Sequence, residues 1–338
     1  MDDERRRQRR EARRKELARR RRRRLLAGLS LVLALALVVA VAVLASGGGS
    51  TPSTSAGRGG GASGGPGTGT HTGTGPRDAS SSSASGTSLG RPTGKPGTES
   101  APILMYHVIN PAPAGAPFPG LYVSASEFAA QVQALASAGF HAVTLDQLRA
   151  YWQDGARLPP GKPIVLSFDN GYQSQYTNAL PVLRRMGWVG DENIQLSGLP
   201  PSQGGLSQTQ IRGLIAAGWE LDTQGYSHAE LTALDAGELE YQIAGARKLI
   251  QRRYGVPVNW FCYPSGHYDA SVVAEVKAAG FVGSTTVIPG WATPSEDPYR
   301  LPRLRVLGGT SPSALLDQIA SAESSAAPPA SYGGAGTA

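Results

Sequence analysis

Polar residues follow several apolar runs in the C-terminal two thirds of the sequence, and some are types that transfer protons or bind metals. A carboxylate such as Asp169 can act as a general base, and imidazoles such as His107 and His228 can transfer a proton or bind a metal. Carboxamides such as Asn170 and Gln224 offer neutral oxygen and nitrogen atoms. These residues belong to four segments, which are 106–107, 169–172, 222–228 and 262–266.

Each of these residues also has a purely structural interpretation. Asp169 can cap the helix that follows it, and Gly171 can form the turn between strand and helix. His228 can be a buried histidine whose hydrogen bonds stabilise the fold. Residue types alone therefore leave both interpretations open.

The segments follow predicted strands in a chain where strands and helices alternate. Such alternation indicates parallel βαβ units, hence an open α/β sheet or a (β/α) barrel. Functional residues of these folds lie at the carboxyl ends of the strands, so the four segments are expected to meet on one rim. Strands are predicted at 102–106, 140–145, 163–168, 219–222, 259–263 and 281–287. Helices are predicted at 126–139, with Ser126 as N-cap, and at 146–152, 172–186, 208–217, 237–254 and 270–279.

The basic character of the chain is confined to its first residues. Residues 1–24 hold fourteen basic and five acidic residues, a net charge of +9, so the remainder of the +7 chain carries −2. An apolar segment of 21 residues, 25–45, follows directly and is long enough to span a membrane as a helix. The positive-inside rule predicts a single-pass protein of the cell membrane with a cytoplasmic N-terminus, and it disfavours nucleic acid as the partner of the basic tail. The small residues at 43–45 leave cleavage of the segment open.

The rest of the chain divides by composition. Residues 46–100 are mostly Gly, Ser, Thr and Pro, which predicts a disordered linker. Residues 101–322 are predicted to form one globular domain outside the cytoplasm, and residues 323–338 a disordered C-terminus. The single cysteine, Cys262, excludes an intrachain disulfide.

Three of the polar segments resemble motifs of the polysaccharide deacetylases, the NodB-homology family (carbohydrate esterase family 4). The segment 163–172, PIVLSFDNGY, resembles the first motif, which reads Thr or Ser, Phe, Asp, Asp, Gly, Tyr. The segment 218–228 resembles the second motif, in which two histidines are four residues apart. The segment 261–266, FCYPSG, resembles the third.

Two further segments are similar to the circularly permuted branch of this family, which deacetylates poly-N-acetylglucosamine. They are the opening 102–107, PILMYH, and the closing 301–303, LPR. The resemblance extends from about residue 101 to 310. It implies a distorted (β/α) barrel of the NodB-homology type.

The resemblance also implies a reaction and roles for residues. A divalent metal, usually zinc, would polarise an acetamide carbonyl and a bound water so that the N-acetyl C–N bond is hydrolysed. Asp169 is expected to be the general base and His107 the acid that protonates the leaving amine. The backbone at Tyr263 would stabilise the oxyanion. Expected substrate contacts are Tyr172, Tyr226 and Pro264.

Two of the three implied metal ligands are replaced in this chain. The family has Asp, His and His at the positions of Asn170, Gln224 and His228. Zinc prefers nitrogen, thiolate and carboxylate ligands, so two neutral amides and one imidazole should hold it weakly or not at all. Asp222, two residues before Gln224 in an extended segment, could lend a carboxylate.

Cys262 stands where much of the family has Arg. A reactive thiol needs a basic neighbour, and the sequence identifies none. A buried, inert thiol is therefore predicted.

Two functions stay open at this point, besides a third in which the basic tail and anchor are the active parts. The first is a membrane-anchored, extracytoplasmic deacetylase of a cell-wall or surface N-acetylglucosamine polysaccharide. The alternative is a catalytically silent protein of the same fold that binds a glycan or a wall-assembly partner. The replaced metal ligands favour the silent protein, whereas the retained Asp169, His107 and His228 favour chemistry.

Overall fold

The computed structural model of the chain describes residues 94–197, 199 and 204–333. The predicted basic tail, the predicted membrane segment and most of the predicted linker lie outside the described residues. Among the helices that are described, none has both the length and the apolar character required to cross a membrane.

In the part of the chain that the structure describes, nine strands form a single sheet in the order β7-β6-β5-β4-β3-β1-β8, with β2 on β3 and β9 on β1. All pairs of strands are parallel except β1 and β8. The predicted α/β class with a parallel sheet is therefore confirmed. The strands are β1 (Ala101–Tyr106), β2 (Phe140–Ala142), β3 (Lys162–Asn170), β4 (Asp191–Ile194), β5 (Glu220–Thr223), β6 (Trp260–Cys262), β7 (Gly283–Thr285), β8 (Trp291–Ala292) and β9 (Leu304–Arg305).

The sheet curves into a parallel-strand half-barrel, and the segment 301–306 links its edges. The backbone N–H of Leu301 donates to the carbonyl of Ser284 in β7. Further along the same segment, the N–H of Val306 donates to the carbonyl of Met105 in β1. The segment 301–306 thus lies beside both β7 and β1, which are far apart in the sequence.

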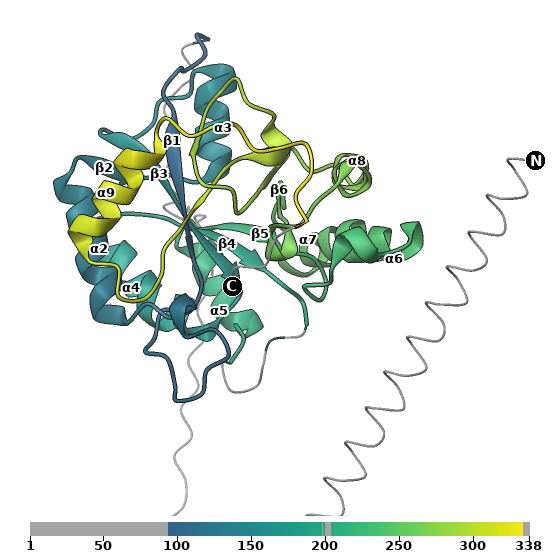
Figure 1. Cartoon of the computed structure of the whole chain (residues 1–338), viewed down its shortest axis with the longest axis horizontal. Helices are drawn as coiled ribbons and strands as arrows, with labels where there is room; N and C mark the ends of the chain where they lie inside the picture. The colour runs from purple at the N-terminus through teal and green to yellow at the C-terminus, as the bar shows by residue number, and fades with distance from the viewer. Residues whose placement is uncertain (1–93, 198, 200–203, 334–338) are drawn as a thin grey trace, which may run out of the picture. The chain divides into compact units, whose positions relative to one another are not determined.

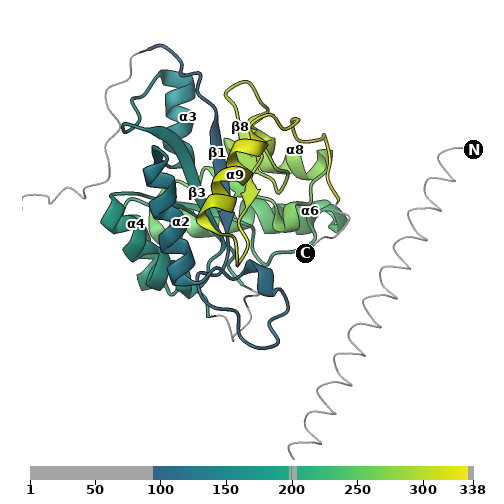
Figure 2. The ribbon, with the colours of Figure 1, turned by 60° about the vertical axis from the view of Figure 1, so that its left-hand side comes forward.

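Helices pack around this sheet, and two that are distant in sequence, α2 and α9, lie side by side (Figures 1 and 2). Ser124, rather than the predicted Ser126, caps α2, because its hydroxyl accepts from the N–H of Glu127 while the Glu127 carboxylate accepts from the N–H of Ser124. The α-helices are α2 (Ala125–Ser137), α3 (Leu145–Asp154), α4 (Leu180–Met186), α5 (Gln208–Ala216), α6 (Ala236–Glu240), α7 (Ala246–Tyr254), α8 (Ala270–Ala278) and α9 (Pro312–Ala322).

Two helices predicted as continuous contain a π-helical turn. The prediction over 172–186 becomes a π-helix at Gln175–Ala179 followed by α4, and the prediction over 237–254 becomes α6, a π-helix at Tyr241–Gly245 and α7. π-helical turns are frequent at functional sites, and the first one starts five residues after Asn170. Hydrophobic periodicity does not distinguish such a turn from an α-helical one.

Strand β4 was missed by the sequence prediction because its residues, Asp-Glu-Asn-Ile, are mostly polar. All four are nevertheless buried between β3 and β5. The short strands β8 and β9 and helix α9 were also not predicted.

The two ends of the domain lie beyond the predicted limits of 101 and 322. On the N-terminal side, the N–H of Gly97 donates to the carbonyl of Tyr151 in α3. On the C-terminal side, Tyr332 exchanges backbone hydrogen bonds with Tyr268, whose hydroxyl donates to the carbonyl of Pro329. Pro329 and Tyr332 are therefore hydrogen-bonded to the domain through Tyr268.

Candidate active site

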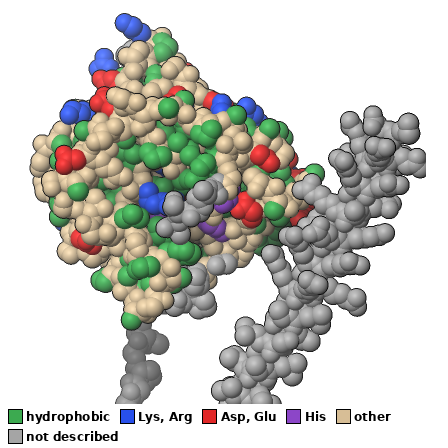
Figure 3. Space-filling model, in the orientation of Figure 1, with side chains coloured by type: hydrophobic (Ala, Val, Ile, Leu, Met, Phe, Trp, Pro, Cys, Tyr) green, Lys and Arg blue, Asp and Glu red, His purple; other side chains and the backbone are tan. Residues whose placement is uncertain are grey.

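A cavity of about 980 Å³ opens at the carboxyl ends of the strands. The predicted rim is thus real, because residues from the ends of β1, β3, β5 and β6 line this one cavity. On the face in Figure 3, histidine side chains and a basic side chain lie beside apolar ones near the middle of the domain. The predicted site residues that line it are His107, Asp169, Asn170, Tyr172, Gln224, His228 and Tyr263.

Asp169 lies at the end of β3 and forms a buried ion pair with Arg303. The two guanidinium nitrogens Nη1 and Nη2 donate to Oδ1 and Oδ2 at 2.7 and 2.9 Å, and neither side chain is exposed by more than 1%. Burial alone would raise the pKa of Asp169, but the charge and hydrogen bonds of Arg303 outweigh it and hold the pKa at about 2. Asp169 is therefore ionised at neutral pH and weakly basic.

Arg303 is held by two further hydrogen bonds. Its Nε donates to the carbonyl of Thr286 at 2.8 Å, and its Nη1 also donates to the hydroxyl of Ser167 at 3.0 Å. The charge of Asp169 raises the pKa of Arg303 above its usual range despite its burial, so the residue stays cationic. Sequence reasoning used Arg303 only as part of the LPR segment and assigned it no role, since 134 positions separate it from Asp169.

Two other side chains complete the surroundings of the Asp169 carboxylate. Asn193 in β4 donates to Oδ1 at 3.0 Å, and the thiol of Cys262 lies 3.6 Å from Oδ2. Nη2 of Arg303 lies 3.1 Å from the Cys262 sulfur, so this thiol does have the basic neighbour that the sequence did not identify. Burial nevertheless raises the pKa of Cys262 to about 12, and the predicted burial of this thiol is confirmed.

His107 follows β1 and is 9% exposed. Burial lowers its pKa to about 4, so the imidazole is neutral at pH 7. Its Nδ1 has no hydrogen-bond partner among the described residues. A neutral imidazole with so low a pKa is a weak base, and it would have to be protonated before it could donate a proton to a leaving amine.

Gln175, in the first π-helix, joins the ends of two strands beneath the cavity. Its Nε2 donates to the carbonyl of His107 at 2.9 Å and to that of Asp169 at 2.8 Å. The side chain is fully buried. Gln175 therefore positions the two residues with the strongest predicted catalytic roles, and no sequence motif identifies it.

The three residues at the family's metal positions line the cavity in different environments. Nδ2 of Asn170 donates to Oε1 of Gln195 at 2.7 Å, and the backbone of Asn170 has a φ of 78°, which Asn tolerates well. Oε1 of Gln224 is buried and has no partner among the described residues. His228 is half-buried, and burial lowers its pKa.

These donors do not fit a zinc ion. Zinc sites use imidazole, thiolate or carboxylate ligands, and of the three residues only His228 belongs to these types. In the described part of the chain, the one group of three His, Cys, Asp or Glu ligand atoms lying within 4.8 Å of one another is Asp191, Glu220 and Asp222. Polysaccharide deacetylases are generally metal-dependent, so the cavity departs at this point from the family that the sequence resembles.

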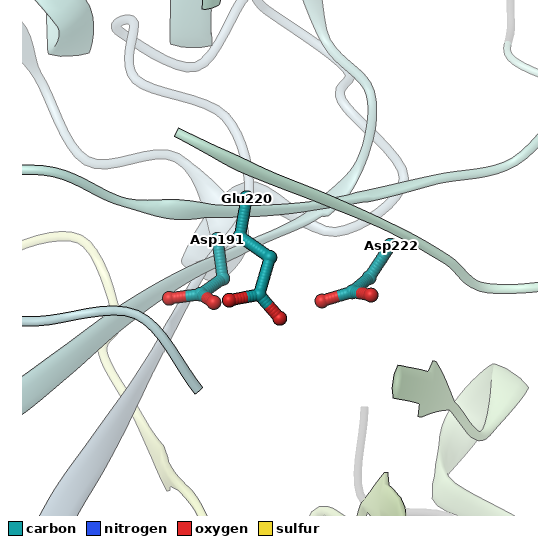
Figure 4. Close-up of side chains that lie close together, drawn as sticks. All are labelled: Asp191, Glu220 and Asp222. Atoms are coloured by element: carbon teal, nitrogen blue, oxygen red, sulfur yellow. The ribbon is translucent and has the colours of Figure 1, made fainter. Parts of the chain in front are cut away.

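That acidic group does not line the cavity. Figure 4 shows the carboxylate of Glu220 between those of Asp191 and Asp222. Oδ1 of Asp222 accepts from the backbone N–H groups of Asn259 and Trp260, so its carboxylate is held at the start of β6. The expectation that Asp222 lends a carboxylate to the metal position is wrong.

Three other predicted site residues have different surroundings from those expected. The N–H of Tyr263 donates to the carbonyl of Thr285 at 3.3 Å, continuing the pairing of β6 with β7, and is not available as an oxyanion donor. The ring of Tyr226 packs against that of Tyr241 in a tilted arrangement, and Tyr226 does not line the cavity. Pro264 is buried and likewise does not line it, whereas Tyr172 does.

Comparison with known proteins agrees with this architecture. Residues 156–284 match the family model described as polysaccharide deacetylase. The Bacillus subtilis protein YxkH, whose name places it among these deacetylases, is 27% identical over 214 residues, covering 63% of this chain and 74% of the relative. A poly-β-1,6-N-acetyl-D-glucosamine N-deacetylase of Staphylococcus aureus is 21% identical over 203 residues, covering 54% of this chain and 67% of that enzyme.

Solved structures show the same fold. A polysaccharide deacetylase-family protein of Bacillus anthracis superposes with a TM-score of 0.59 at 25% identity, over 66% of this chain and 69% of that one. The Streptococcus pyogenes deacetylase PplD, solved with acetate, superposes with a TM-score of 0.60 at 21% identity, over 67% of this chain and 99% of that one. This chain therefore carries a polysaccharide deacetylase domain of the NodB-homology family.

Proposed function

We propose that this protein recognises an N-acetylglucosamine-containing polysaccharide of the cell wall or cell surface, without hydrolysing it efficiently. The observation that carries the proposal is the replacement of family metal ligands by Asn170 and Gln224 within an otherwise well-formed cavity. A cavity of about 980 Å³ has the volume of a site for a sizeable ligand. The relatives that act on poly-N-acetylglucosamine suggest the class of glycan.

Hydrolysis of the N-acetyl group is the second candidate, and it has a specific observation in its favour. His107, Asp169 and His228 all line the cavity, and Asp169 is ionised as a general base must be. Two other observations count against it. The donor set does not suit zinc, and burial keeps His107 neutral at the pH where it would have to donate a proton.

The location of the domain is part of the proposal. The basic tail 1–24 and the apolar segment 25–45 support a single-pass protein whose domain lies outside the cytoplasm. A linker as long as 46–100 would let the domain reach a polysaccharide away from the membrane. Protease treatment of intact cells is expected to remove the domain; complete protection, with cleavage only after lysis, would contradict this arrangement.

Binding and turnover can be measured on the same sample. The full chain in mild detergent is mixed with a fully acetylated β-1,6-linked N-acetylglucosamine oligosaccharide, and both heat of binding and released free amine are followed. Saturable binding without amine release is expected. Release that disappears in Asp169→Asn would assign the protein to hydrolysis, and absence of binding to this glycan and to its β-1,4-linked counterpart would reject the proposal.

A further inference from the structure

The cavity contains buried polar atoms without hydrogen-bond partners among the described residues. They are Oε1 of Gln224, a residue 3% exposed, and Nδ1 of His107, a residue 9% exposed. Leaving a buried donor or acceptor unpaired is costly, so such atoms on a cavity wall indicate a place for a polar ligand or a water. Both residues come from strand ends whose backbones are fixed by the sheet.

Asn170 adds a carboxamide that is held rigidly on the same wall. Its Nδ2 donates to Oε1 of Gln195, and Nε2 of Gln195 donates in turn to the carbonyl of Ser197 at 2.8 Å. This chain of bonds fixes the plane of the Asn170 amide without using its Oδ1. Oε1 of Gln224 and Oδ1 of Asn170 are carboxamide acceptors of the kind that pair with the N–H of a secondary amide.

The charges around the cavity favour a neutral ligand group over a cationic one. The carboxylate of Asp169 is neutralised by two hydrogen bonds from Arg303, and Asn193 also donates to it. Arg305, a second basic residue, lines the cavity. An ammonium group entering here would lose its hydration without finding an uncompensated carboxylate.

We propose that Asn170 and Gln224 recognise the intact acetamide of an N-acetylated sugar without a metal ion, and that the cavity thereby distinguishes acetylated from de-N-acetylated polysaccharide. The inference rests on the proposed function, because it names the chemical group by which the same cavity recognises its glycan. The inference also explains why this chain lacks two of the family's metal ligands, because Asn170 and Gln224, which replace them, bind an amide instead.

The test compares two forms of one oligosaccharide on the full chain in detergent. Calorimetry measures binding of the fully acetylated β-1,6-linked oligosaccharide and of its fully de-N-acetylated form, each with and without EDTA. The acetylated form is expected to bind at least about tenfold more tightly, and EDTA to change nothing. Gln224→Leu is expected to weaken binding of the acetylated form about three- to tenfold. The matched variant Gln208→Leu, on the exposed start of α5, is expected to bind as the wild type does.

Each of the other outcomes contradicts either the acetamide inference or the proposed function. Loss of binding in EDTA, restored by zinc, or equal affinity for both forms overturns the acetamide inference but leaves glycan recognition in place. Unchanged affinity in Gln224→Leu, with folding verified by circular dichroism, removes Gln224 from recognition and overturns the inference as well. Absence of binding by either form rejects the proposed function itself.

Discussion

The Asp169–Arg303 pair is the strongest electrostatic feature at the residue scale. Truncating one partner of a buried pair leaves the other charge uncompensated, which typically costs about 3–5 kcal/mol. We expect Arg303→Met to lower the free energy of unfolding by about that amount in urea titrations. The control is Arg300→Met, whose pair with Asp297 is about 28% exposed and should matter by less than about 1 kcal/mol. Equal effects of the two substitutions would contradict the central role of the buried pair.

His107 should make stability depend on pH. Because burial lowers its pKa to about 4, His107 binds a proton near pH 6.5 in the unfolded chain but only near pH 4 in the folded chain. The folded state therefore loses stability as the pH falls from about 6.5 to 4, on the order of 3 kcal/mol. Asp169 contributes with the same sign at lower pH, since its depressed pKa makes its stabilisation disappear toward pH 2.

The contribution of His107 can be isolated by substitution. We expect His107→Asn to flatten the dependence of unfolding free energy on pH between 4 and 6.5, measured by urea titration at several pH values. A slope equal to that of the wild type would mean that His107 is not held neutral by burial.

At the scale of elements, the π-helix Gln175–Ala179 fixes the ends of β1 and β3 relative to each other. We expect Gln175→Leu to destabilise the protein by about 1–3 kcal/mol, because two buried carbonyls lose their donor. Affinity for the acetylated oligosaccharide should fall as well. Thr177→Val, at an exposed position of the same turn, should stay within about 0.5 kcal/mol of the wild type. If Gln175→Leu behaves like Thr177→Val, the strand ends are positioned by other contacts.

The strands and helices that the sequence predicted well are those in which the pattern of hydrophobic residues follows the burial of their side chains. The apolar run of β3 and the periodic α2 and α8 are reproduced within a few residues. Strand β4 was missed because its first three residues are carboxylates and an amide, a polar composition that predicts a loop although all three are buried. The π-helical turns were missed because they change the backbone and not the composition.

At the scale of the whole molecule, the half-barrel places two polar clusters in different surroundings. The cavity residues lie at strand ends, whereas Asp191 and Glu220 lie at the starts of β4 and β5. There the N–H groups of Leu145 and Asp146, at the start of α3, donate to these two carboxylates. Burial, together with the nearby Asp146, raises the pKa of Glu220 to about 7.

This acidic group should lower stability at alkaline pH. A carboxyl with a raised folded pKa keeps its proton in the folded state, so stability is lost as the pH rises from about 4.5 through 7. We expect Glu220→Gln, which can keep the bond from the Asp146 N–H, to stabilise the protein at pH 8 by about 1–3 kcal/mol. The exposed Glu240→Gln should change stability by less than about 0.5 kcal/mol. Destabilisation by Glu220→Gln at pH 8 would show that the ionised carboxylate is favourable there.

The candidate site was predictable to the extent that its residues stand in local motifs. His107, Asp169, Asn170, Gln224 and His228 were placed on one rim by strand order alone, and all line the cavity. Arg303 was not assigned, because its contact with Asp169 depends on how the segment 301–306 bridges the sheet edges. Tertiary contacts of this kind have no signature in residue spacing.

The central claim, recognition of a glycan by a domain that has lost its metal site, is tested most directly by zinc content measured together with amine release. The full chain is equilibrated with zinc, desalted, analysed by elemental mass spectrometry and assayed on the acetylated oligosaccharide. The wild type is expected to retain no stoichiometric zinc and to release no amine. The double variant Asn170→Asp, Gln224→His should retain zinc, whereas the control Asn170→Asp, Gln208→His should not. Stoichiometric zinc in the wild type, with amine release that depends on Asp169, would contradict the account.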